Sequence, residues 1–61
     1  MNAEIKKLID QHGTQAGVAL AFGVTEQAVS KWIKAGRLPR LRAEQARDRW
    51  GLSASALMGV A

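Results

Sequence analysis

The 61-residue sequence contains no cysteine, one histidine and one proline, and it has no long apolar run. Without cysteine, neither a disulfide nor a zinc site with thiolate ligands can hold the fold together. His12 has no second histidine or cysteine with which to share a metal ion, so no metal site is expected. The apolar segments are too short to span a membrane, and the start MNAEIKKLID lacks the apolar core of a signal peptide. The fold must therefore be stabilised by the packing of side chains, either within one chain alone or together with a partner subunit.

The sequence also lacks the features of an enzyme. It has no nucleophile–base pair, no cluster of metal-binding side chains and no glycine-rich phosphate loop. Residues 1–61 are expected to form one small domain, which is too small to enclose a substantial pocket. We therefore expect no catalytic activity, no cofactor and no small-molecule ligand.

Basic residues outnumber acidic ones by nine to five, and the net charge of +4 favours a polyanionic partner. Composition alone does not separate nucleic acid from an acidic membrane surface. The basic residues are concentrated between positions 31 and 49, where only two acidic residues accompany them. The basic residues of this segment are Lys31, Lys34, Arg37, Arg40, Arg42, Arg47 and Arg49. A solubilising surface would account for the same excess.

Residues 14–34 predict two short helices joined by a turn at Gly23. Thr14 and Thr25 each precede a helical run and are typical N-cap residues, and Gly23 suits a left-handed position between the helices. The apolar residues fall on one face of each helix: Val18, Ala19 and Phe22 in the first, and Val29, Trp32 and Ile33 in the second. The small Ala19 allows the two helices to cross closely. This pattern is that of a helix-turn-helix motif.

The outer face of the second helix, about residues 26–34, carries polar side chains of an unusual kind. It lacks the alternating Glu and Lys pairs of a face that only meets water. Its residues are Glu26, Gln27, Ser30, Lys31 and Lys34. Glutamine, serine and lysine suit base edges and phosphates in a major groove. The alternative is an ordinary solvated helix face.

Helices are also predicted at about residues 3–11 and 40–50, and Ser53 is expected to cap a last short helix. Within 40–50, Leu41, Ala46 and Trp50 are spaced for one side, and Arg47 and Arg49 are expected to pair with Glu44 and Asp48. The tail, about residues 51–61, should either close the core or contact a second subunit. The expected fold is all-α, a small helix-turn-helix domain of about five helices. The alternative is an α+β domain with a C-terminal strand hairpin.

The stretches HGTQ and FGVTEQAVSKW, within residues 12–34, resemble the helix-turn-helix of Cro-type repressors of lambdoid phages, and YdaS-type regulators have a similar layout. The resemblance implies a λ-repressor-like fold and a dimeric transcriptional repressor on a palindromic double-stranded DNA operator, in the cytoplasm of a bacterial host. A non-catalytic interaction module, such as an antitoxin-type regulatory partner, is the alternative function.

In the family that the chain resembles, the first two residues and the sixth of the second motif helix meet base edges. In this sequence these are Glu26, Gln27 and Lys31. Ala28 is placed to touch a thymine methyl, and Ser30 to reach a base or a phosphate. Glu26 has the alternative role of favouring its helix N-terminus electrostatically. The predicted contacts to the DNA backbone are Thr14, Gln15, Thr25, Lys34, Arg37, Arg40 and Arg42.

Overall fold

The computed structural model describes residues 2–60, and within that range the chain is helical without any strand. The helices are α1 (Ala3–His12), α2 (Gln15–Phe22), α3 (Glu26–Ala35), α4 (Arg40–Trp50) and α5 (Ala54–Leu57). The prediction of an all-α domain with about five helices is confirmed, and the alternative with a strand hairpin is wrong. Met1 and Ala61, which the predicted domain includes, lie outside the described residues.

The predicted N-caps are confirmed by their hydrogen bonds. The hydroxyl oxygen of Thr14 accepts from the Gly17 amide at 3.0 Å, and that of Thr25 accepts from the Ala28 amide at 3.2 Å. Ser53 caps α5 in the same way, at 3.3 Å from the Ala56 nitrogen. These bonds satisfy amides that a helix start leaves without an internal partner, and so fix where each helix begins.

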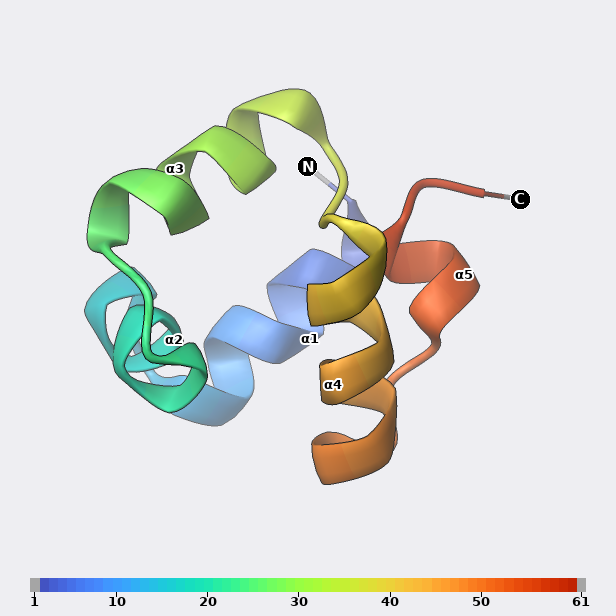
Figure 1. The fold of residues 1–61 in the computed structure, drawn as a ribbon, viewed down its shortest axis with the longest axis horizontal. Helices are drawn as coiled ribbons and strands as arrows, with labels where there is room; N and C mark the ends of the chain where they lie inside the picture. The colour runs from blue at the N-terminus through green and yellow to red at the C-terminus, as the bar shows by residue number, and fades with distance from the viewer. Residues whose placement is uncertain (1, 61) are drawn as a thin grey trace.

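Figure 1 shows α2 and the start of α3 at one end of the molecule and α4 and α5 at the other, with α1 between them. One apolar core connects these helices. Its buried residues are Ile5, Leu8, Val18, Ala19, Phe22, Val29, Trp32, Leu38, Ala43, Ala46, Leu52 and Leu57. Within this core the Phe22 ring meets Trp32 and the half-buried Trp50 edge to face, at centroid distances of 5.5 and 5.2 Å. Trp32 is therefore a core residue, as the spacing of α3 predicted.

The prediction for one side of α4 needs a correction. Ala46 is buried and Trp50 is half-buried, but Leu41 is 59% exposed. The residue that faces the core instead is Ala43, which is fully buried. Ala43, Ala46 and Trp50 are separated by three and four positions and so share a face, whereas Leu41 lies about 200° around the helix from Ala43.

The segment after α4 closes the core from the side of α1. Leu52 and Leu57 are buried, and the Leu57 carbonyl accepts a 2.7 Å hydrogen bond from the Leu38 amide. The Asn2 side chain caps α1 and also donates to the carbonyls of Gly36 and Ala56. Through these hydrogen bonds Asn2 holds the start of α1 against both α5 and the segment that follows α3.

Within the described residues, none of the helices has the length and apolar character that crossing a membrane would require.

Candidate nucleic-acid interface

The turn between α2 and α3 is held by backbone hydrogen bonds that require a left-handed residue. Gly23 has a φ of 71°, its amide donates to the Leu20 carbonyl, and the amide of Val24 donates to the Ala19 carbonyl. This is the Schellman arrangement, which ends a helix and turns the chain sharply. Ala19 is buried where α2 and α3 pack together, so its small side chain permits the close crossing that the sequence predicted.

The α3 helix presents one face to the core and the opposite face to solvent. Val29 and Trp32, on its inner face, are 2% and 9% exposed. Of the predicted base-contacting residues, Glu26, Gln27 and Lys31 are exposed, and Ala28 and Ser30 are half-buried at the edges of that face. In Figure 1, α3 runs along one edge of the molecule, and its side chains Gln27, Lys31 and Lys34 are exposed.

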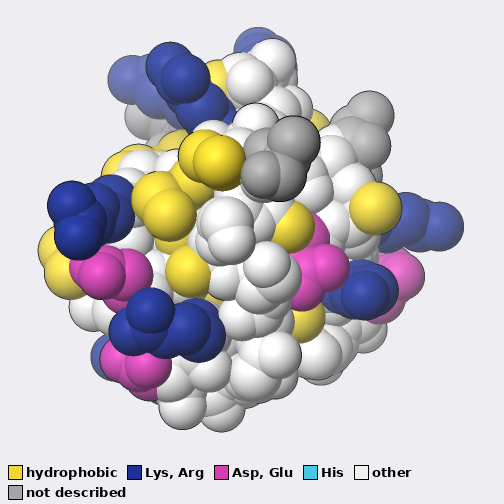
Figure 2. Space-filling model, turned by 90° about the vertical axis from the view of Figure 1, so that its right-hand side faces the viewer, with side chains coloured by type: hydrophobic (Ala, Val, Ile, Leu, Met, Phe, Trp, Pro, Cys, Tyr) yellow, Lys and Arg dark blue, Asp and Glu magenta, His cyan; other side chains and the backbone are white. Residues whose placement is uncertain are grey.

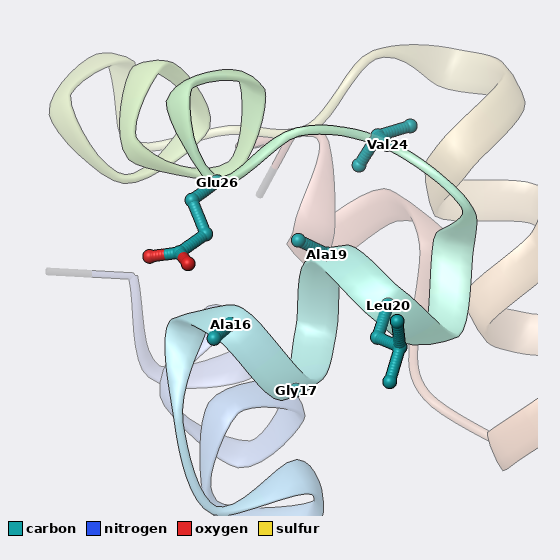
Figure 3. A pocket seen from close by; sticks show the side chains of 6 residues that line it. All are labelled: Ala16, Gly17, Ala19, Leu20, Val24 and Glu26. Carbon is teal, nitrogen blue, oxygen red and sulfur yellow. The ribbon is translucent and has the colours of Figure 1, made fainter.

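Glu26 occupies a special position among these residues. Figure 3 shows its carboxylate extending from the start of α3 toward the turn of α2 that contains Ala16, beside a shallow hollow. The hollow is lined by Ala16, Gly17, Ala19, Leu20, Val24 and Glu26. The carboxylate belongs to the first residue of α3, and a helix N-terminus is a position that favours negative charge.

The residues predicted to contact the DNA backbone lie at the ends of α2 and α3 and at the start of α4. Most are exposed, namely Thr14, Gln15, Thr25, Lys34, Arg37 and Arg40. The hydroxyls of Thr14 and Thr25 accept from helix amides, so each still has its O–H hydrogen to donate. Arg42 is half-buried, and its guanidinium donates to the side chain of Gln45 at 3.0 Å.

The ion pairs expected along α4 form only in part. Arg47 pairs with Asp48 at 3.1 Å, as predicted, while Glu44 is 3.8 Å from Arg40. The prediction that Arg49 pairs with Glu44 or Asp48 is wrong, because its guanidinium donates to the Ala21 carbonyl at 3.1 Å. That carbonyl lies in the last turn of α2, where helix carbonyls lack internal partners and the dipole favours a cation. Arg49 therefore links the end of α4 to the helix-turn-helix.

Gly17 lies inside α2, at a point where the backbone of α1 comes close. A Cβ atom at this position would lie 2.5 Å from the carbonyl oxygen of His12, the last residue of α1. Inside a helix glycine costs about 1 kcal/mol relative to alanine, and the close approach of the α1 backbone explains its presence here, since glycine alone leaves room for the oxygen.

A family model described as the DNA-binding transcriptional regulator Cro matches residues 4–47. The matched segment contains the whole helix-turn-helix and most of α1 and α4. No curated protein and no solved structure matches the chain.

Proposed function

The chain belongs to the Cro family of DNA-binding transcriptional regulators, and from this premise we propose that it represses transcription as a homodimer on a palindromic operator. In this proposal each copy places α3 in the major groove of one half-site. The observation that carries the proposal is the two-sided α3, whose Val29 and Trp32 are fixed in the core while Gln27 and Lys31 face solvent. A B-form major groove is wide enough to admit such a helix.

Gln27 and Lys31 are the side chains best suited to reading bases. They are four positions apart, so they lie on the same side of α3 one turn from each other. Glutamine can make two hydrogen bonds to adenine, and lysine donates to the O6 and N7 atoms of guanine. Ala28 and Ser30 border this line and would contact a thymine methyl and a base or phosphate. Glu26 would accept from a cytosine amine, and it would repel sequences that place no such donor there.

The DNA backbone of the operator would be contacted near both ends of α3. Thr14, Gln15 and Thr25 would donate to phosphates near the starts of α2 and α3, and helix N-termini favour such anions. The cations Lys34, Arg37, Arg40 and Arg42 would contact phosphates beyond the other end of α3. Contacts of this kind fix the position of the protein without reading sequence.

Selection of bound fragments from random double-stranded DNA tests the proposal. The expected result is a palindromic consensus whose half-sites are about one helical turn, roughly 10 base pairs, apart. Fragments with no consensus, released at low salt, would contradict sequence-specific reading and favour the non-catalytic interaction module.

A further inference from the structure

The last turn of α4 contacts the last turn of α2 through two adjacent side chains. The Arg49 guanidinium donates to the Ala21 carbonyl at 3.1 Å. The ring of Trp50 meets the ring of Phe22 edge to face, at a centroid distance of 5.2 Å. We call these two contacts the α2–α4 link. Ala21 and Phe22 immediately precede Gly23, so the link is made beside the turn that leads into α3.

The α2–α4 link connects two helices that pack most closely on other neighbours. The closest packing of α2 is with α1 and α3, and that of α4 is with α5. In Figure 1, α1 lies between α2 and α4. Because α4 reaches α2 through long side chains, the relative position of the two helices depends on those side chains.

The Ala21 carbonyl is well suited to accept from a cation. The turn after α2 uses the two preceding carbonyls, since the amides of Gly23 and Val24 donate to Leu20 and Ala19. A helix end leaves its last carbonyls without internal partners and carries a partial negative charge, which a cationic donor satisfies. A guanidinium is planar and presents its hydrogens in fixed directions, so the bond also constrains the orientation of the two helices.

Arg49 is used differently from other cations of α4. Arg40 pairs with Glu44 at 3.8 Å, and Arg47 pairs with Asp48 at 3.1 Å. Figure 2, which views the side of the molecule that carries α4 and α5, shows several basic side chains directly beside acidic ones. Exposed ion pairs of this kind constrain a fold little. Arg49 instead bonds a backbone atom 28 positions earlier in the chain, which ties two helices together.

We infer that Arg49 is a positioning residue for DNA recognition, which holds α2 and the turn after it so that α3 enters the groove at the correct angle. The inference rests on the proposed function and adds to it a residue that does not touch DNA. A recognition side chain must be held within about 0.5 Å and 10–20° of its productive geometry. The family model matches residues 4–47, so Arg49 lies outside the segment on which family membership rests.

The α2–α4 link also sets the spacing of the proposed phosphate contacts. Thr14 and Gln15 lie at the start of α2, and Arg40 lies at the start of α4. Both groups must meet the same duplex while α3 is in the groove, so a shift of α2 relative to α4 moves one group away from its phosphate. Loss of Arg49 should therefore weaken sequence-specific binding, which needs all contacts at once, more than non-specific binding, which depends on charge.

The first test compares Arg49→Met with Arg47→Met, which removes the same charge from the same turn of α4. Each variant is titrated on the selected operator and on a random duplex of equal length. Arg49→Met should reduce the ratio of the two affinities by about 10-fold, the size of one lost base contact, and Arg47→Met should leave the ratio unchanged. Arg49→Lys, which keeps a cationic donor, should retain most of the preference.

The outcomes of this test separate positioning from other roles of Arg49. Circular dichroism at the temperature of the titrations establishes that each variant is folded, and Arg49→Gln replaces Arg49→Met if the latter is unfolded. A folded variant that keeps the ratio of the parent would overturn the inference and leave Arg49 a role in stability alone. A lower salt slope on both duplexes with an unchanged ratio would show direct phosphate contact and would also overturn it. A parent protein that binds both duplexes equally would contradict the proposed function itself.

The second test measures the relative position of the two helices in the absence of DNA. Because the chain has no cysteine, Leu20→Cys and Leu41→Cys allow one spin label on the exposed side of α2 and one on that of α4. The distribution of distances between the labels should be the same in the parent and in Arg47→Met, and should broaden or shift in Arg49→Met. An unchanged distribution in Arg49→Met would show that other contacts position α2, and would overturn the assignment.

Discussion

Base discrimination by a helix in a major groove depends on a few side chains, and Gln27 is the one whose removal is most informative. It is exposed, neutral and in the first turn of α3, so its truncation leaves the core and the net charge unchanged. We predict that Gln27→Ala costs about 1–3 kcal/mol of binding free energy on the selected operator and relaxes specificity at one base pair. Gel-shift titration on the operator and on single-base variants measures both effects.

The control for this prediction is Gln11→Ala, which makes the same change at an exposed position of α1. It should bind the operator and random DNA as the parent does. A Gln27→Ala variant that weakened binding equally on every duplex would show that Gln27 contacts the backbone rather than a base.

Arg40 allows the proposed phosphate contacts to be tested at a single cation. Its side chain is 83% exposed, and its pair with Glu44 spans 3.8 Å, so the guanidinium is free to turn toward DNA at little cost. We predict that Arg40→Ala reduces the slope of log K against log salt by about one unit and leaves base preference unchanged. Lys6→Ala removes the same charge from an exposed position of α1 and should leave the slope as it is. An unchanged slope for Arg40→Ala would place Arg40 away from the backbone.

Among the helices, α1 and α2 approach each other closely through their backbones at Gly17. An alanine at Gly17 would gain about 1 kcal/mol of helix propensity but would press its Cβ against the His12 carbonyl, at 2.5 Å in the present geometry. Overpacking of this kind costs about 1–3 kcal/mol, and the neighbouring atom is backbone, which yields poorly. We therefore predict that Gly17→Ala lowers the free energy of unfolding in urea titrations, despite the better helix former.

The neighbouring residue supplies the control. Ala16 is exposed in the same helix, so Ala16→Gly should lose about 1 kcal/mol through propensity alone. If Gly17→Ala proved more stable than the parent by a similar amount, the close approach of α1 would not limit this position.

The helices themselves could be predicted from the sequence because their signals are local. Thr14, Thr25 and Gly23 mark starts and a stop within a few residues of the backbone groups they satisfy, and the apolar spacing of α3 shows its inner face directly. The outer face of α3, which supplies the predicted base contacts, follows from the same periodicity.

The tertiary contacts of polar side chains could not be predicted in this way. Arg49 reaches a carbonyl 28 positions earlier, and Asn2 reaches one 54 positions later. No local pattern distinguishes these residues from others that only meet water. Leu41 was wrongly assigned to the core face for a different reason. The residues of α4 that are buried in the core are alanines, whereas a search for apolar periodicity favours large residues such as leucine.

At the scale of the whole molecule, the fold is closed by contacts between the start of α1 and the start of α5. The Glu4 carboxylate accepts a 2.6 Å hydrogen bond from the Ser53 amide and lies 3.4 Å from the Lys7 ammonium. The Ser53 amide is the main cause that lowers the pKa of Glu4, with Lys7 adding to it and desolvation opposing it. Because no disulfide joins the two ends, this charge-assisted bond is one of the few polar contacts that hold α5 and its buried Leu57 on the core.

Protonation of Glu4 at low pH should therefore weaken its contact with Ser53 and lower the stability of the fold. A carboxyl whose pKa is lower in the folded than in the unfolded state stabilises the fold at pH values above its unfolded pKa, near 4.3, and that stabilisation is lost as the pH falls through the folded pKa. We predict that Glu4→Gln lowers the melting temperature at pH 7, and that the difference from the parent shrinks on acidification and vanishes below the folded pKa. Lys7→Gln should have a smaller effect, because it leaves the Ser53 hydrogen bond in place. Thermal unfolding followed by circular dichroism between pH 7 and 2.5 measures the three proteins together. A constant offset between Glu4→Gln and the parent over that whole range would mean that the charge of Glu4 does not contribute to closure.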